Sequence, residues 1–212
     1  YDVWEHCLHA LGFLSADAPS ALCHATLLHD IGKPSCFVLG EDGRGHFYGH
    51  EEAGARLLVE DYTRLRWPVG EVRLMEYLVH YHDRPIEDSP RGIRRALARA
   101  NRVLNTGADG AREAFSLLLC LKRADTLAHA HRAIHKRMRE LDRVQAQYEE
   151  ELERGCAFCV ADLAIGGADL LEMGVERGPL VGYILKRLVR EVVDDVLPNT
   201  PDALRARAKA FM

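Results

Sequence analysis

Apolar residues recur at helical spacing along nearly the whole chain, and this pattern restricts the fold more than any other feature. The first series runs from Val3 to Leu11, and others follow at residues 21–28, 50–66, 69–82 and 90–102. Glycine and proline separate the series, as they do at helix ends. At 212 residues, 48% of them hydrophobic, the chain is long enough to bury one good core. The sequence therefore predicts an all-α helical bundle.

Two segments break or complicate this rhythm. Within residues 36–48, two short apolar stretches flank a charged, glycine-rich run, which favours a hairpin or an ordered loop. Residues 105–110 are expected to form a loop, and residues 111–153 to form one very long helix or two joined end to end. We expect a boundary near Gly155, with a first domain of residues 1–155 and a helical tail of residues 156–212.

Charge and composition limit the classes of partner. A net charge of −4 argues against a surface that wraps nucleic acid on all sides, although the arginines from Arg91 to Arg102 could form a local basic patch. No apolar run is long enough to cross a bilayer and the first residues do not resemble a signal peptide, so we expect a cytoplasmic protein without a membrane partner. The six cysteines suit a reducing compartment, and the Cys156 and Cys159 pair is interpreted as structural.

A candidate metal site begins at His29 and Asp30, adjacent residues at the end of a predicted helix. The partial negative charge of a helix C-terminus favours a cation, and imidazole with carboxylate binds divalent ions. Further ligands could come from His6, in the first predicted helix, and from Asp125, which is costly to bury in an apolar helix without a metal or a partner. The alternatives are a helix-capping pair at His29 and Asp30, and a salt bridge from Asp125 to Lys122 or Arg123.

This order of His, His-Asp and Asp resembles the HD superfamily of metal-dependent phosphohydrolases. Four segments look like its successive motifs: LLHDIGKP (27–34), FYGHEEAGA (47–55), YLVHYHDRP (77–85) and KRADTLAH (122–129). Residues 2–11, 163–188 and 197–204 are similar to the HD domain and following helical region of bacterial CCA-adding tRNA nucleotidyltransferases. The nucleotidyltransferase head of those enzymes is absent, so we expect that this chain does not add nucleotides by itself. It is either a free-standing HD protein or a piece of a longer one.

The resemblance implies roles for individual residues. It places His6, His29, Asp30 and Asp125 at metal-ligand positions, and His50 and His82 at positions that bind a second metal or touch the substrate phosphate, with His80 as the substitute for His82. Lys33 matches a phosphate-contacting lysine, with Arg84 as a helper, so the expected catalytic residues are Asp30, Lys33 and His50. The other histidines are expected to have no role in the site: His9, His24, His46, His129, His131 and His135.

The implied function is hydrolysis of a phosphomonoester or phosphodiester, assisted by one or two divalent ions of manganese, nickel, magnesium, iron or zinc. The candidate substrates are a phosphorylated small molecule, a nucleotide such as a 2′,3′-cyclic nucleotide, and a terminal RNA phosphate. tRNA or an RNA end is a candidate partner, and a homodimer stays open. Residues 174–182 resemble a helix-hairpin-helix turn, which is interpreted as structural, with weak nucleic-acid contact as the alternative. Two other classes compete: a tRNA-binding HD module or CCA-adding enzyme fragment without its own catalysis, and a nucleotide sensor without turnover.

Overall fold

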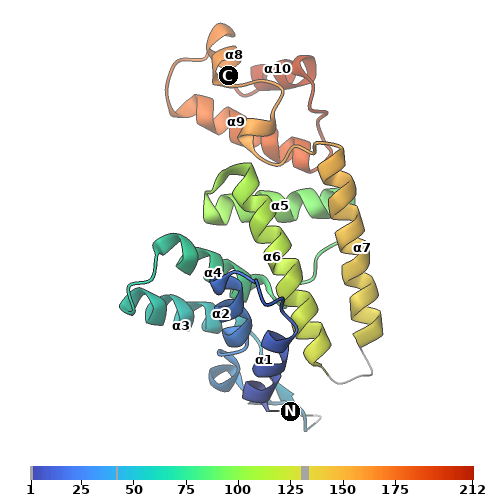
Figure 1. Ribbon diagram of the computed structural model, residues 1–212. Coiled ribbons are helices and arrows are strands. Elements are labelled where there is room, and N and C mark those ends of the chain that lie inside the picture. Colours follow the sequence, from blue (N-terminus) through green and yellow to red (C-terminus); the bar gives the residue numbers. More distant parts are fainter. Residues whose placement is uncertain (1, 42, 130–133) are drawn as a thin grey trace. The chain divides into compact units, whose positions relative to one another are not determined.

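The computed structural model describes residues 2–41, 43–129 and 134–212 and is built almost entirely of helices (Figure 1). The described residues form ten α-helices: α1 Val3–Gly12, α2 Ser20–Leu28, α3 His50–Arg64, α4 Val69–Tyr81, α5 Pro90–Leu104, α6 Gly107–Ala128, α7 Ile134–Glu153, α8 Gly167–Glu172, α9 Pro179–Val193 and α10 Pro201–Lys209. Two short 3-10 helices are η1 Lys33–Cys36 and η2 Val160–Asp162. The all-α prediction is confirmed. No helix in these ranges is both long and apolar enough to cross a lipid bilayer.

The segment at residues 36–48 contains a hairpin rather than an irregular loop. Strands β1 Val38–Leu39 and β2 Gly45–His46 pair antiparallel, with Val38 opposite His46 and Leu39 opposite Gly45. This hairpin lies between η1 and α3 in the chain, so it connects two elements that carry candidate site residues.

The expected loop at residues 105–110 is shorter than the sequence suggested, because α6 already begins at Gly107. Asn105 ends α5 in the left-handed conformation, with φ of 56°, and Gly107 follows with φ of 77°. Two positive φ values so close together turn the chain within three residues. The glycines at 107 and 110 therefore belong to the new helix and not to the loop.

The segment at residues 111–153 forms two helices that run antiparallel, so the prediction of helices joined end to end was wrong. Arg123 of α6 forms an ion pair with Asp142 of α7 at 2.7 Å, and the Tyr148 hydroxyl of α7 donates to the Arg112 carbonyl at 3.1 Å. Going forward along α6 from Arg112 to Arg123, the partner on α7 moves backward from Tyr148 to Asp142, as it does between antiparallel helices. Helical periodicity alone continues through a chain reversal and could not show it.

The chain divides into two compact units: unit 1 comprises residues 1–85 and 113–143, and unit 2 comprises residues 86–112 and 144–212. Within unit 1, α2 and α3 pack against α4, and the buried side chains include Leu22, Leu58 and Leu78. Unit 2 has a separate apolar core of residues 157–208 that includes Leu170, Ile184, Leu188 and Leu204. Both long helices, α6 and α7, contribute residues to both units, so this division does not follow a single cut near Gly155. A functional boundary there stays a prediction.

Unit 2 also contains the Cys156 and Cys159 pair as free thiols. Burial, followed by the nearby Glu151 carboxylate, raises the pKa of Cys156 to about 11. This thiol is therefore protonated near neutral pH and is a poor nucleophile and metal ligand.

Candidate metal centre

Six of the residues singled out in the sequence come together in unit 1, carried by the ends of four helices and the middle of a fifth. His29 caps the C-terminus of α2 and is followed by Asp30, while His82 caps the C-terminus of α4. His50 is the first residue of α3, His6 lies in α1 and Asp125 lies in α6. Segments up to 119 residues apart in the sequence thus meet at one point.

The first group of ligand atoms surrounds the His29 imidazole. Its Nε2 lies 3.2 Å from the His6 Nε2 and 3.4 Å from the Asp125 Oδ1. The His6 Nε2 lies 2.9 Å from the same Asp125 oxygen. Asp30 completes the group through Oδ2, at 3.4 Å from His29 and 3.7 Å from His6.

The second group uses the other oxygen of Asp30. Oδ1 lies 3.4 Å from the His50 Nε2 and 3.6 Å from the His82 Nε2, and these two nitrogens are 3.4 Å apart. Asp30 therefore presents one carboxylate oxygen to each group of imidazoles. Such a shared carboxylate is suited to bridging two neighbouring cations.

The tautomers of three histidines are fixed by backbone carbonyls, which can only accept hydrogen bonds. The Nδ1 atoms of His29, His50 and His82 donate to the carbonyls of residues 26, 47 and 79 at 2.7, 2.9 and 2.6 Å. Each Nε2 is then left to face the cluster. Protein metal sites commonly orient their imidazole ligands in this way.

The donor set fits divalent metal ions. Each of the groups His6–His29–Asp125 and Asp30–His50–His82 offers three ligand atoms that lie within 4.8 Å of one another. Ligand atoms bound to one ion at about 2.1 Å are separated by about 3 Å, close to the distances observed. Imidazole nitrogens as near as those of His6 and His29 also repel unless a proton or a cation lies between them.

The charges of the metal-free cluster are strongly coupled. Burial opposes ionisation of Asp30, but hydrogen bonds from His29, His50 and His82 prevail and hold its pKa far below the ordinary value. Burial likewise opposes the charged form of Asp125, whose pKa is nevertheless lowered by His29 and His6. The Asp125 and Asp30 carboxylates in turn raise the pKa of His29 well above 6.5, against the effect of burial. Hydrogen bonding to Asp30 raises the pKa of His50.

Two lysines stand next to the cluster in different ways. The Lys33 Nζ lies 2.5 Å from the Asp30 Oδ2, so this residue is placed to offset the negative charge of the site. The buried Lys122 instead donates to the carbonyls of His82 and Arg84, at 2.5 and 2.6 Å. It thereby holds the chain at the end of α4, where His82 lies. Burial lowers the pKa of Lys122 to about 8.

The salt-bridge alternative for Asp125 does not describe its surroundings. Lys122 binds backbone carbonyls, and Arg123 pairs with Asp142 on α7. The Asp125 carboxylate faces His6, His29 and His129 instead. Asp125 thus faces imidazoles, the side chains that most often share a divalent ion with a carboxylate.

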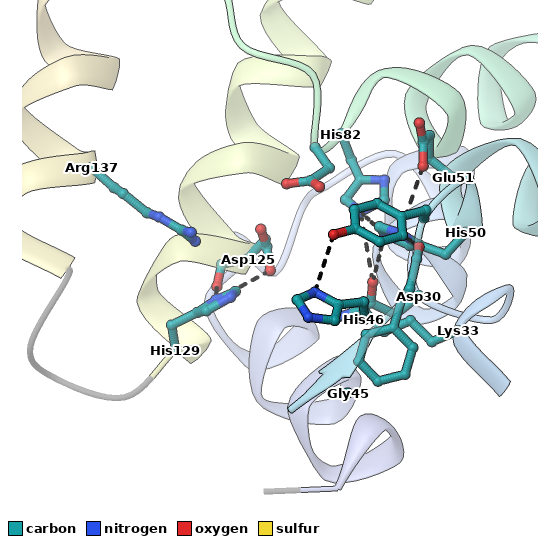
Figure 2. A pocket seen from close by; sticks show the side chains of 14 residues that line it. Asp30, Lys33, Gly45, His46, His50, Glu51, His82, Asp125, His129 and Arg137 are labelled. Atoms are coloured by element: carbon teal, nitrogen blue, oxygen red, sulfur yellow. Dashed lines mark hydrogen bonds and ion pairs between the residues drawn. The ribbon is translucent and has the colours of Figure 1, made fainter. Parts of the chain in front are cut away.

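The cluster forms part of the wall of a cavity of about 450 Å³. His46 and His129, which we expected to have no role in the site, also line it, as do Tyr48, Asp83 and Arg137. Figure 2 draws Arg137 and His129 on one side of the cavity, and Lys33 and His50 on the other. The residues that line it are Asp30, Lys33, Gly45, His46, Phe47, Tyr48, Gly49, His50, Glu51, His82, Asp83, Asp125, His129 and Arg137.

Some expected contributors lie elsewhere. His82, and not His80, faces Asp30, and the Arg84 guanidinium stacks over the Tyr81 ring at 5.2 Å. His131 lies outside the described residues. His129 could have been found from the sequence, because it stands four residues after Asp125 on the same helix face. Arg137 carries no such signal, since its place depends on the reversal between α6 and α7.

The chain is similar to tRNA nucleotidyltransferases. Residues 116–208 match the family model described as tRNA nucleotidyltransferase domain 2. The A-adding tRNA nucleotidyltransferase of Deinococcus radiodurans is 32% identical over 215 residues, which cover 97% of this chain and 45% of that protein. The CC-adding tRNA nucleotidyltransferase of Thermus thermophilus is 32% identical over 190 residues, or 88% of this chain and 40% of that protein. A CCA-adding enzyme of Latilactobacillus sakei is 51% identical over 49 residues, 23% of this chain and 12% of that enzyme.

The chain thus spans less than half the length of these curated relatives. The two longer alignments cover most of this chain. They support the resemblance to the body region of CCA-adding enzymes that the sequence motifs indicated.

Proposed function

We propose that this chain is the body region of a tRNA nucleotidyltransferase-like protein and that its unit 1 is a metal-dependent phosphohydrolase of the HD superfamily. The observation that carries the catalytic part is Asp30, whose two oxygens face two separate groups of imidazoles. The tRNA part rests on the similarity to the named tRNA nucleotidyltransferases. The proposed substrates are phosphate esters of nucleotides or of RNA ends.

The residues of the cluster have distinct roles in this proposal. His6, His29, Asp30 and Asp125 would hold one divalent ion, and His50 and His82 with Asp30 would hold a second. Ions of manganese, nickel, magnesium, iron or zinc held there supply Lewis acidity toward a phosphoryl oxygen and acidify water. Lys33 offsets the charge of the phosphate. Where only the first ion is bound, the His50 Nε2 carries no metal, and this imidazole, whose Nδ1 donates to the Phe47 carbonyl, is placed to accept a proton there.

A second candidate function is support of tRNA without catalysis by this chain. The similarity to proteins named as tRNA nucleotidyltransferases favours it, because those names describe chemistry on tRNA. In that case the cluster binds metal only to stabilise unit 1, and no substrate is hydrolysed in the cavity. The two candidates therefore agree on metal binding and differ in hydrolysis.

Replacement of Asp30 by asparagine tests the catalytic proposal. Asp30→Asn keeps the shape of the side chain but removes the charge shared by both groups of imidazoles. We expect its metal content and its hydrolysis of bis-p-nitrophenyl phosphate and 2′,3′-cyclic nucleotides to fall at least about 100-fold, since loss of mere outer-sphere partners already costs 10–100-fold. The measurements are elemental analysis of the purified chain and phosphate-ester assays with manganese, nickel or magnesium.

Asp61→Asn is the matched control, because Asp61 is a half-exposed residue of α3 outside the cavity lining and its side chain pairs locally with Arg64. It should leave metal content and hydrolysis unchanged. If the wild-type chain binds metal but hydrolyses neither substrate, while a gel shift shows that it binds tRNA, catalysis is excluded and the second candidate stands. Equal hydrolysis by the wild type and Asp30→Asn would place the activity outside this cluster.

A further inference from the structure

Two aromatic rings lie side by side at the cavity, next to the metal cluster but not part of it. The rings of His46 and Tyr48 are nearly parallel, with 5° between their planes and 5.3 Å between their centroids. A hydrogen bond of 3.3 Å between the Tyr48 hydroxyl and the His46 Nδ1 joins them, drawn as a dashed line in Figure 2. We call these two rings the hairpin platform. Both residues line the same cavity as Asp30 and His50.

Side chains of the hairpin and its flanking residues pack against one another. The rings of Phe37 and Phe47 lie 5.7 Å apart, and a Cβ at Gly45 would come within 2.5 Å of the Phe37 ring. The Lys33 Nζ lies 5.7 Å from the centroid of the Phe47 ring. Lys33 also pairs with Asp30. The hairpin is therefore connected to the cluster by side-chain contacts as well as by the chain.

Gly49 alone separates the platform from the cluster along the chain. Tyr48 is 78% exposed, whereas His50, two residues later, is 7% exposed. Between them Gly49 has φ of 77°, in the left-handed region that favours glycine. The Cα atoms of Tyr48 and His50 are at most about 7 Å apart, the reach of two residues. Both side chains line the same cavity, so one ligand can reach both.

We propose that the hairpin platform binds the base of a nucleotide whose phosphate lies at the metal cluster. The placement of the phosphate at the cluster rests on the proposed function, whereas the placement of the base rests on the rings of His46 and Tyr48. A cavity of about 450 Å³ is much larger than a phosphate ion needs and lies in the range of small-ligand pockets. An exposed tyrosine ring can stack on any base, because every base has a π-face. The platform thus selects nucleosides over other phosphate esters, without reading which base is present.

The test compares two ligands that share a phosphate and a ribose but differ in the base. Isothermal titration of the full chain with AMP and with ribose 5-phosphate, in the presence of manganese, should show tighter binding of AMP by about tenfold, the scale of one base stacked on an aromatic ring. Tyr48→Ala should bring the affinity for AMP down to that for ribose 5-phosphate. Tyr48→Phe, which keeps the ring but loses the hydroxyl, should retain the preference.

Leu39→Ala is the matched control, because Leu39 is 66% exposed in the same hairpin and does not line the cavity. It should leave both affinities unchanged. The inference is overturned if the wild type binds AMP and ribose 5-phosphate equally, including the case that neither binds, or if Tyr48→Ala weakens both alike. Because these titrations do not depend on turnover, a preference for AMP without hydrolysis removes only the catalytic proposal. Hydrolysis without a preference removes only the platform.

Discussion

Asp30 concentrates the electrostatics of unit 1 in one buried carboxylate. Its side chain is almost completely removed from solvent, yet its pKa is held far below the ordinary value, because three imidazoles donate to it after burial has opposed its charge. The Lys33 ammonium group lies against the same carboxylate. In the metal-free protein, protons on the imidazoles balance the charge of this carboxylate. A divalent ion that binds to the same nitrogen atoms has to displace those protons.

This exchange predicts that metal binding releases protons. Hydrogen bonds to Asp125 and Asp30 raise the pKa of His29 well above 6.5 in spite of its burial, so the metal-free imidazole keeps its proton to higher pH than an ordinary histidine. We expect about one proton to leave for each manganese ion bound, and the apparent affinity to rise about tenfold per pH unit between pH 6 and pH 7. Titration calorimetry in two buffers with different ionisation enthalpies measures the protons released. An affinity that is flat over this range, with no proton release, would contradict the prediction.

At the residue scale, the sequence predicts best those positions whose chemistry is local. His29 and Asp30 are adjacent and followed by a turn, so their common location needs no tertiary information. Their meeting with His6 and Asp125 was expected only from the motif order, because no local rule connects residues so far apart. Lys122 was considered only as a partner for Asp125. Its contacts with two carbonyls after α4 depend on how α6 packs on that turn.

At the level of elements, the cluster depends on helix ends that approach closely. The turn after α2 crosses the first turns of α3 at Gly32, where a Cβ would lie 2.1 Å from the His50 carbonyl oxygen and 2.6 Å from the Gly54 nitrogen. Both contacts are with backbone, so no side chain can rotate away to make room. The spacing between His50 and Asp30 therefore requires glycine at position 32.

Gly32→Ala should both destabilise the chain and weaken metal binding. The added methyl group must push α3 away from the turn, which we expect to cost about 1–3 kcal/mol in the free energy of unfolding, the range of overpacked interiors. Gly70→Ala, in the first turn of α4, meets no atom within 4 Å and should have little effect. Urea denaturation and manganese titration of both variants give the comparison. Equal stability of the Gly32→Ala and Gly70→Ala variants would show that the turn after α2 and the start of α3 can move apart at no measurable cost.

The elements themselves were largely predictable, and the errors have a common cause. Ser89 before Pro90 is a helix-start signal in the sequence, and in the structure Ser89 caps α5 by accepting from the Gly92 amide at 3.0 Å. The antiparallel course of α6 and α7 was missed, because apolar periodicity reports the buried face of a helix and not its direction relative to the next. Arg137 reaches the cavity only through that reversal. Its place in the site was therefore hidden for the same reason.

For the chain as a whole, the cluster links the stability of unit 1 to metal concentration. Its ligands come from residues 6 to 125, so the unfolded chain cannot present them together and an ion binds the folded state almost exclusively. At a free manganese concentration 100 times the Kd, the folded state gains about 2.7 kcal/mol for one ion. For a chain of this length, we expect the Tm to rise by roughly 5–10 °C. Thermal unfolding followed by circular dichroism, with and without EDTA, measures this shift.

The same measurement on Asp30→Asn separates binding at the cluster from weaker binding elsewhere. With 32 aspartates and glutamates, the chain offers many surface carboxylates, and these exist in the unfolded chain as well. Ions bound to them favour neither state strongly, so the variant should show a shift of at most about 1–2 °C. A shift in Asp30→Asn as large as in the wild type would mean that manganese stabilises the chain through other residues. The cluster would then lose its role as the link between folding and metal.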